Sequence, residues 1–204
     1  MSDKKLAVIF DNGHGSTING VYQTEGKRSP DWAKGVLYEG VANRWIVNKT
    51  IHKMDYARLP YYHVSPELTD VSLGERIARA DKIYAANPNS YGVSVHFNAA
   101  GGTGWEIFTS PGVTQSDKIA AEFIDVFKSA MPLKFRSGGA GELNEDKEAN
   151  FAMVLKPKAP FILLELGFMD NPTDYEMIWN PNFQELLSDL IFKSIVRVNN
   201  KFGK

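Results

Sequence analysis

The alternation of short apolar segments with longer amphipathic ones constrains the fold of this chain more than any other feature. Four apolar runs have the length of a buried strand, at residues 6–10, 91–97, 105–109 and 161–166. The segments between and after them have helical spacing of their apolar residues, which predicts helices over residues 37–55, 72–86, 114–131 and 180–199. Strands that alternate with helices favour an α/β domain in three layers, with helices flanking a mostly parallel, mixed sheet.

Short polar motifs predict where three helices begin. Ser-x-x-Glu and Thr-x-x-Glu are typical of a capping box, and Asn-Pro is typical of an N-cap followed by proline in the first turn. These motifs are Ser72 with Glu75, Thr173 with Glu176, and Asn180 with Pro181. Residues 56–71 are expected to form a strand or a loop. The polar, glycine-rich segment 132–150 is too long for a plain connection, which predicts a functional or mobile loop, with residues 138–148 as a candidate lid.

Length and composition indicate one globular domain over residues 1–204. Hydrophobic residues make up 43% of the chain and charged residues 23%, which is typical of a folded protein rather than a disordered one. The net charge is -1 and no run of Lys or Arg stands out, so neither nucleic acid nor membrane insertion is expected. The apolar run 6–10 is too short for the core of a signal peptide, so we expect synthesis in the cytoplasm without an export signal.

Ionisable residues stand at the ends of three of the expected strands. His14 follows the first strand, and His96 and Glu165 lie near the ends of two later ones. Ligands of open α/β sheets gather at the carboxyl ends of the strands. We therefore expect these three side chains to share one site.

The residue types at this edge are those of a metal site. The chain has no Cys and four His, so a zinc site has to use His and carboxylate ligands, with a fourth position left open for water. His14 is flanked by Gly13 and Gly15, which let the backbone bend and leave the ring exposed. His96 alternates out of phase with the apolar residues of its strand. Glu39, at the start of the first helix, is the candidate third ligand.

Glu165 is unusual because it lies within the apolar sequence Ile-Leu-Leu-Glu-Leu-Gly-Phe. A buried, unpaired carboxylate is costly, and burial raises its pKa toward the value that suits a general base. The alternative is an ion pair with Arg76 or Arg136, which is a common fate of a buried acid.

Each candidate also has a simpler interpretation when it is taken alone. His14 would be an ordinary loop residue, His96 a hydrogen-bonded residue at a strand end, and Glu39 a favourable charge at a helix N-terminus. The other two histidines, His52 and His63, match no motif and are expected to be solvated, packed or structural. Four aromatic residues either line a groove or fill the core: Trp32, Tyr61, Tyr62 and Trp105.

Six motifs follow one another in an order that points to one family. They are Asp11-Asn12-Gly13-His14-Gly15, Glu39 with Asn43, Leu73-Gly74-Glu75-Arg76, Ser94-Val95-His96-Phe97-Asn98, Gly104-Trp105-Glu106, and Glu165-Leu166-Gly167-Phe168 followed by Asn171. Together they resemble the motifs of the amidase_3 family of zinc-dependent N-acetylmuramoyl-L-alanine amidases. The resemblance covers nearly the whole chain.

This resemblance implies that His14, Glu39 and His96 bind one Zn²⁺ ion and that Glu165 activates the zinc-bound water. The metal would polarise the substrate carbonyl and lower the pKa of the water. The bond cut would be the amide between N-acetylmuramic acid and L-alanine of peptidoglycan. Three further residues would orient the ligands: Asn43, Asn98 and Glu106.

We expect a monomeric enzyme of the endolysin type, from a phage or prophage. It would act on the cell wall, in the periplasm or outside the cell, after release through a holin-like pore. A bacterial enzyme whose signal peptide has been removed would look the same. Two rival functions stay open: a zinc peptidase or carboxypeptidase acting on the stem peptide, and a non-catalytic cell-wall-binding module. A site of His and carboxylate ligands also binds manganese or cobalt.

Overall fold

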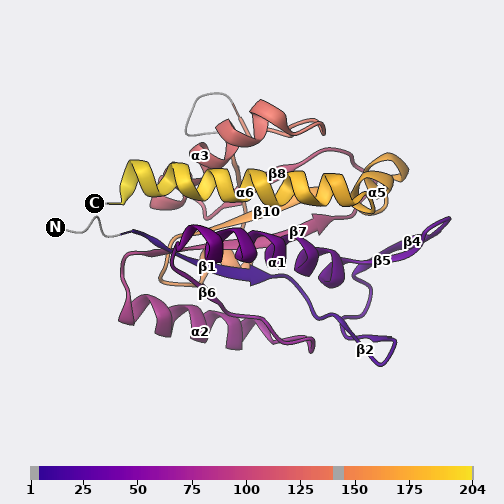
Figure 1. The fold of residues 1–204 in the computed structure, drawn as a ribbon, viewed down its shortest axis with the longest axis horizontal. Coiled ribbons are helices and arrows are strands. Elements are labelled where there is room, and N and C mark those ends of the chain that lie inside the picture. The colour runs from indigo at the N-terminus through magenta and orange to yellow at the C-terminus, as the bar shows by residue number, and fades with distance from the viewer. Residues whose placement is uncertain (1–4, 140–144, 204) are drawn as a thin grey trace.

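A six-stranded sheet lies at the centre of the molecule (Figure 1), in a computed structural model that describes residues 5–139 and 145–203. Its strands are β1 (Ala7–Asn12), β6 (Tyr61–His63), β7 (Ser90–Asn98), β8 (Glu106–Thr109), β9 (Lys147–Glu148) and β10 (Phe161–Phe168). They follow the order β6-β1-β7-β10-β8-β9 across the sheet. Segments that are far apart in the sequence therefore become neighbours at its centre.

The strands at the centre of the sheet are parallel. β1 pairs with β6 and β7, and β7 pairs with β10, all in parallel, whereas β8 runs antiparallel to β10. The prediction of a mostly parallel, mixed sheet is confirmed. The carboxyl ends of β1, β7 and β10 consequently lie together at one edge of the sheet, on the right in Figure 1.

Helices cover both faces of the sheet, which confirms the predicted three-layer α/β class (Figure 1). One face packs against α1 (Glu39–Ala57) and α3 (Gln115–Ala130), and α6 (Pro181–Phe202) packs against both of these helices. The other face packs against α2 (Leu73–Ala86) and the short α4 (Ala152–Leu155). The remaining helix, α5 (Pro172–Ile178), follows β10 at the edge where the central strands end.

The side chains of β1 show why the sheet needs cover on both faces. All six residues of this strand are buried. Val8 and Phe10 belong to the larger core under α1, α3 and α6, whereas Ile9 belongs to the smaller core under α2 and α4. Successive side chains of a strand point to opposite faces, so a continuous apolar run can be buried only in a sheet that is covered twice.

Of the three helix starts predicted from polar motifs, two are confirmed and one is wrong. Ser72 accepts a hydrogen bond from the backbone N–H of Glu75 at the start of α2, and Asn180 caps α6. The start predicted at Thr173 lies too far along the chain, because the side-chain oxygen of Asn171 caps α5.

The polar segment before α1 forms two small hairpins rather than a plain loop. β2 (Thr17–Ile18) pairs with β3 (Val21–Tyr22), and β4 (Arg28–Trp32) pairs with β5 (Gly35–Tyr38). Strand β5 of the second hairpin includes Leu37 and Tyr38, which were predicted to be the first residues of the helix. Helix α1 therefore begins at Glu39. These strands are too short and too polar to show alternation over the length that identifies a strand.

The segment predicted to be a functional or mobile loop joins the sheet in part. Phe135 forms an isolated bridge with Trp105, and β9 pairs with β8. The described parts of this segment thus extend the edge of the sheet. Residues 140–144, which belong to the candidate lid, lie outside the described residues.

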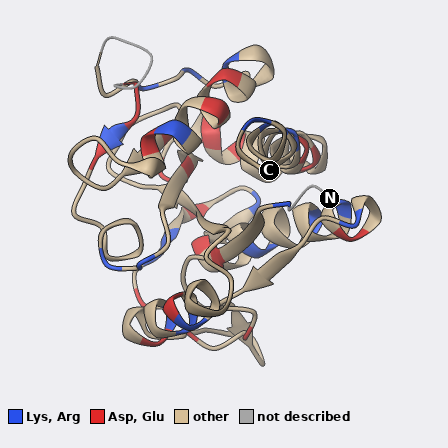
Figure 2. Ribbon diagram, turned by 90° about the vertical axis from the view of Figure 1, so that its left-hand side faces the viewer, with Lys and Arg blue, Asp and Glu red and all other residues tan. Residues whose placement is uncertain are grey.

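Charged residues of both signs are interspersed along the helices and loops (Figure 2). Several form exposed ion pairs, such as Arg79 with Glu67 at 2.7 Å and Arg197 with Asp125 at 2.6 Å. Pairs of this kind each add little to stability. Within residues 5–139 and 145–203, no helix is both long enough and apolar enough to cross a membrane.

Candidate metal centre

Three side chains with metal-binding groups converge at the carboxyl ends of the central strands. His14 follows β1, His96 lies in β7, and Glu39 is the first residue of α1. The neighbours of His96 along the strand, Val95 and Phe97, face the larger core, so His96 points to the opposite side. The structure therefore brings together the three residues that the sequence analysis assigned to a metal.

These three side chains lie within reach of a single ion. His14 Nε2 is 3.2 Å from Glu39 Oε2, and His96 Nδ1 is 2.9 Å from Glu39 Oε1. The two imidazole rings meet edge to face, with centroids 5.1 Å apart and an interplanar angle of 89°. One ligand atom from each residue lies within 4.8 Å of the others. Ligands at about 2.1 Å from a tetrahedral zinc ion are roughly 3.4 Å apart, so the spacing suits one cation.

The two histidines hold Glu39 in its ionised form. Burial alone would raise the pKa of this carboxyl, but the hydrogen bonds and charges of His14 and His96 outweigh burial and keep that pKa well below its usual range. The opposite holds for His96. Burial alone would lower the pKa of its imidazole, but the hydrogen bond to Glu39 and the charge of that carboxylate raise it. Glu39 is thus in the anionic form that a metal ligand requires.

Glu165 stands beside His96, at paired positions of the neighbouring strands β10 and β7. Its Oε2 atom is buried and has no hydrogen-bond partner among the described residues. Burial is the main cause that raises the pKa of this carboxyl to about 8, and it outweighs the opposing charge of His96. Glu165, which is partly buried, thus differs chemically from the buried Glu39.

The two arginines considered as partners of Glu165 are engaged elsewhere. Arg76 lies 2.9 Å from Asp11, and Arg136 lies 2.6 Å from Glu106. The ion pair that was the alternative for Glu165 is therefore wrong. The carboxyl at this strand end is left without a charged partner from either arginine.

A cleft of ≈ 580 Å³ is lined by the three metal-binding residues together with Glu165. Its lining also includes Glu25 and Lys27 from the turn before β4, and two exposed apolar side chains, Leu73 and Phe151. The cleft thus combines charged groups with apolar surface around the four predicted site residues.

The donor set fits a divalent metal ion. Two imidazoles and one carboxylate are a common ligand set for such ions, and three protein ligands leave a coordination position for water or substrate. The buried anion of Glu39 between His14 and His96 supplies the negative charge that a cation needs. The roles of these residues, and of Glu165 as a base, stay predictions.

Comparison with known proteins assigns the chain to a family. Its sequence matches the profile of Amidase_3, described as N-acetylmuramoyl-L-alanine amidase, over residues 8–197. The chain belongs to the Amidase_3 family. The resemblance inferred from the six motifs is thereby confirmed.

Two curated relatives of this Amidase_3 chain are named as amidases. The N-acetylmuramoyl-L-alanine amidase CwlM of Bacillus licheniformis is 32% identical over 130 residues, which are 60% of this chain and 46% of CwlM. An uncharacterized cell wall amidase of Bacillus anthracis is 28% identical over 203 residues, which are 93% of this chain and 34% of that protein. The chain thus spans less than half the length of these curated relatives.

A solved structure shares the fold of this Amidase_3 chain. The crystal structure of N-acetylmuramoyl-L-alanine amidase from Clostridium difficile 630 has a TM-score of 0.80 and 22% sequence identity. The match covers 98% of this chain and 100% of that chain. At this level of identity the likeness is one of fold.

Three residues of this Amidase_3 chain are expected to orient the metal ligands, and they differ from one another in their hydrogen-bond partners. Asn43 Nδ2 donates to the backbone carbonyl of Gly13 at 2.9 Å, directly before His14. Asn98 Nδ2 donates to Glu106 at 2.9 Å, and the other oxygen of Glu106 accepts from two cationic side chains. Asn43 therefore touches the backbone beside a predicted ligand, whereas Glu106 contacts Asn98 rather than a metal-binding side chain.

The remaining histidines lie outside the metal-binding group. His52 is exposed on α1. His63 is partly buried and hydrogen-bonded to Asn12, and burial lowers the pKa of its imidazole to about 4. Of the two alternatives expected for His52, solvated or packed, the structure shows the solvated one, and the environment of His63 agrees with a structural histidine.

The aromatic residues singled out from the sequence do not line the cleft. Trp105 is buried and stacks on Phe135, and Trp32 packs against Tyr175. Phe151 lines the cleft instead, although it belongs to none of the six sequence motifs. Its only signal in the sequence is that it is the first apolar residue of large size after the long polar segment.

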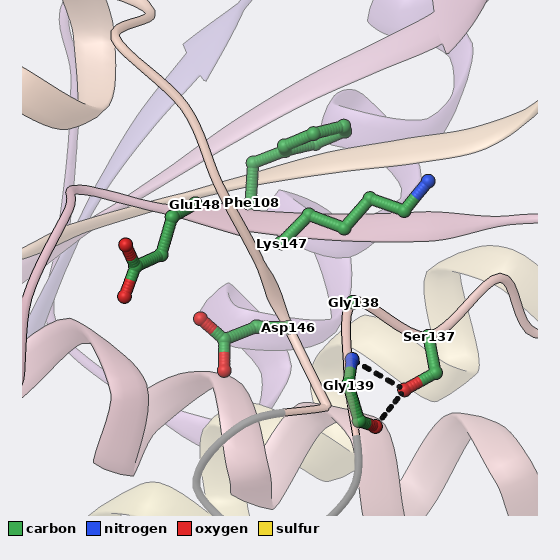
Figure 3. A pocket seen from close by; sticks show the side chains of 7 residues that line it. All are labelled: Phe108, Ser137, Gly138, Gly139, Asp146, Lys147 and Glu148. Carbon is green, nitrogen blue, oxygen red and sulfur yellow. Dashed lines mark hydrogen bonds between the residues drawn. The ribbon is translucent and has the colours of Figure 1, made fainter.

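A second cavity, of ≈ 510 Å³, lies beside β8 and β9 (Figure 3). Its lining includes Phe108, Lys147 and the buried Asp146, whose carboxyl has a pKa that is raised mainly by burial. None of the four predicted site residues lines this cavity. The chemistry of the Amidase_3 chain is therefore expected in the first cleft.

Proposed function

We propose that this chain hydrolyses the amide bond between N-acetylmuramic acid and L-alanine of peptidoglycan, with one Zn²⁺ ion as its cofactor. The observation that carries the proposal is the carboxyl of Glu165, whose buried Oε2 has no hydrogen-bond partner among the described residues, in the cleft that also holds His14, Glu39 and His96. A purely structural buried acid is normally paired, and an unpaired one beside a metal-binding group is typical of a general base. Membership of the Amidase_3 family supports the choice of substrate.

His14, Glu39 and His96 would hold the zinc ion. Bound zinc would supply Lewis acidity, which polarises the amide carbonyl and lowers the pKa of a water molecule. Glu39 would contribute the one negative charge of the ligand set, and the two imidazoles would bind in their neutral form.

Glu165 would move the proton during hydrolysis. Its unpaired Oε2 accepts a proton from the attacking water, whose oxygen forms a bond to the carbonyl carbon. The C–N bond then breaks, and Glu165 returns the proton to the nitrogen of L-alanine, which leaves as an amine. A cation held by His14, Glu39 and His96 would lower the pKa of Glu165 from about 8 and would so make its carboxylate available as a base at neutral pH.

Other residues of the cleft suit a substrate that is part sugar and part peptide. Leu73 and Phe151 offer exposed apolar surface, whereas Glu25 and Lys27 offer charges of both signs. A polymer of uncharged sugars and charged peptides presents both kinds of surface. These contacts support the proposed substrate class without selecting a particular stem peptide.

Mass spectrometry of the soluble products of purified peptidoglycan tests the proposal. Untreated protein, EDTA-treated protein, and EDTA-treated protein with zinc restored would be compared. We expect free stem peptides that begin at L-alanine, lost with EDTA and regained with zinc. Fragments cut within the peptide would assign the site to a peptidase or carboxypeptidase. Wall binding without any released product would assign the chain to the binding modules.

The place of action and the assembly state follow as further proposals. The substrate lies in the cell wall, so the enzyme would act in the periplasm or outside the cell, and lysis after release from the cytoplasm stays a prediction.

We also expect a monomer, which light scattering of the zinc-loaded protein would test. Loading with manganese or cobalt in place of zinc would identify which ion supports the reaction best.

A further inference from the structure

Three successive backbone carbonyls at the His14 loop are held by side chains from two helices. The carbonyls of residues 12–14 accept in turn from Arg76 at 3.1 Å, Asn43 at 2.9 Å and Arg44 at 2.8 Å. Asn43 and Arg44 lie on α1, and Arg76 lies on α2. The loop that carries a predicted metal ligand is thus fixed through its backbone.

The His14 loop needs such support because its conformation is unfavourable. His14 has a φ of 68°, in the left-handed region that residues other than glycine rarely adopt. Conformations of this kind persist only where the surrounding structure holds them. The one ion pair of the His14 ring among the described residues is with Glu39, so the ring does not anchor the loop elsewhere.

Of the three donors, Arg44 is the one whose buried charge is hardest to explain. Its side chain is only 6% exposed, and within the described residues it forms no ion pair with a carboxylate. Its guanidinium donates to the backbone carbonyls of His14, Gly40 and Glu67, and its Nε has no partner. A buried cation that is balanced by carbonyl groups alone is costly. An uncharged side chain at position 44 would avoid the cost of burying this positive charge.

The contacts of Arg44 connect two predicted metal ligands. Arg44 Nη1 donates to the carbonyl of His14 at 2.8 Å and to that of Gly40 at 2.9 Å. Gly40 follows Glu39 in the first turn of α1. One nitrogen atom therefore ties the loop of one ligand to the helical turn of another.

We propose that Arg44 is a positioning residue of the metal centre, which sets the placement of His14 relative to Glu39. This inference rests on the proposed function, because it takes these two residues as metal ligands. Arg44 does not line the cleft, so it acts through the backbone of His14 and not on substrate.

The sign of the effect separates positioning from electrostatics. Removing a buried positive charge close to a cation site would, by charge alone, strengthen metal binding. Removing the hydrogen bonds that fix His14 would weaken it. Arg44→Met suits this test because it keeps much of the buried apolar volume and removes every donor, and such replacements of buried charges are often tolerated by the fold.

We would measure zinc affinity by competition with a chromophoric chelator, and thermal unfolding of each metal-free protein. We expect Arg44→Met to bind zinc about 10- to 100-fold more weakly than wild type, as found when groups that orient metal ligands are removed. Arg44→Lys should recover part of the loss, because an ammonium reaches fewer carbonyls than a guanidinium. The visible spectrum of the Co²⁺-loaded protein should change in Arg44→Met, since it reports ligand geometry.

Arg79→Met is the matched control. Arg79 also donates to a backbone carbonyl of the segment after β6, that of Val64 at 2.9 Å, and it makes no hydrogen bond to the His14 loop. This variant should bind zinc as wild type does. A loss as large as that of Arg44→Met would overturn the inference, because it would show that any lost arginine in this region has the same effect.

Equal or tighter zinc binding by a folded Arg44→Met protein would overturn the inference and leave the metal centre standing. A wild-type protein that binds no zinc would overturn both. If Arg44→Met does not fold, Arg44→Lys decides, and unchanged affinity together with an unchanged Co²⁺ spectrum would count against positioning.

Discussion

Glu39 and Glu165 are two carboxyl groups whose surroundings drive their pKa values apart. Glu39 lies between two histidines, which hold the pKa of its carboxyl well below its usual range despite burial. Glu165 lacks such partners, and burial raises the pKa of its carboxyl to about 8. Titratable groups with diverging pKa values are typical of separate acid–base roles, which agrees with the proposed roles of Glu39 as a metal ligand and Glu165 as a base.

The replacement Glu165→Gln tests the role of the base. It removes the proton acceptor and leaves His14, Glu39 and His96 unchanged, so the release of stem peptides should fall by about 10²- to 10⁴-fold while zinc content stays at the wild-type level. Product mass spectrometry and metal analysis of the same sample measure both effects. The control is Glu176→Gln, which alters an exposed carboxylate paired with Lys34 and should leave activity intact. Activity close to wild type in Glu165→Gln would remove Glu165 from the mechanism.

The stability of the metal-free protein should depend on pH through Glu165. The pKa of this carboxyl is about 8 in the folded state against 4.5 for the free group, so between these values the folded chain keeps a proton that the unfolded chain has lost. The free energy of unfolding contributed by this group therefore falls as pH rises from the lower value to the higher one. Urea unfolding in EDTA should show wild type losing on the order of a few kcal/mol relative to Glu165→Gln between about pH 5 and about pH 8.5. A difference that is the same at both pH values would contradict the raised pKa.

The convergence of the four predicted site residues could be expected from the sequence, because three of them stand near the ends of predicted strands and Glu39 stands at the start of a predicted helix. The fate of Glu165 could not be expected, since an ion pair with Arg76 or Arg136 depends on where those side chains reach in space. Arg76 instead pairs with Asp11, and Arg136 pairs with Glu106. Burial of an acid is readable from its apolar neighbours, but its partner is not.

The first turn of α1 approaches the His14 loop so closely that a side chain at one position would collide with it. A Cβ atom at Gly40 would lie 1.8 Å from the backbone oxygen of Gly15. Gly40→Ala should therefore push the turn that carries Glu39 away from the loop. We expect a loss on the order of 1–3 kcal/mol in the free energy of unfolding, together with weaker zinc binding.

Gly74→Ala is the counterpart in α2. Gly74 is also the second residue of its helix, and a Cβ atom there meets nothing within 4 Å. Alanine should be neutral or stabilise the protein by up to about 1 kcal/mol through helix propensity. Thermal unfolding and zinc titration of the two variants side by side check both expectations. If Gly40→Ala behaves like Gly74→Ala, the close approach of the turn is not a constraint.

Elements with strong end signals were predicted better than those without. The caps at Ser72 and Asn180 placed α2 and α6, because their side-chain hydrogen bonds are local. The hairpins before α1 escaped prediction, since strands of two to five residues carry too little alternation. The start of α1 shifted for the same reason, as β5 took residues whose apolar spacing also fits a helix.

The whole molecule should respond to zinc as one unit. Ligands from a loop, a helix and a strand come together only in the folded chain, so zinc binds the native state in preference to the unfolded one. Free zinc at a hundred times its Kd should stabilise the protein by about 2.7 kcal/mol and raise the Tm in one cooperative transition. Calorimetry with and without EDTA measures both effects. His96→Ala should show no such rise, and two separate transitions would contradict the prediction of a single domain over residues 1–204.

The class of the fold was predictable because alternating strands and helices leave few arrangements. The order of the strands in the sheet could not be predicted from the sequence. β10 lies between β7 and β8, although a long stretch of chain separates it from both. Such pairings depend on contacts between distant segments, which no local pattern records.

The two described ends of the chain lie side by side, and this has a consequence for rearranging the protein. The backbone N–H of Leu6 donates to Asn199 Oδ1 at 2.7 Å, and β1 begins and α6 ends on the left in Figure 1. The cleft lies at the opposite edge of the sheet, where β1, β7 and β10 end. A short linker that joins the ends, with new termini opened at the exposed turn of Gly112, would give a circular permutant whose cleft is unobstructed.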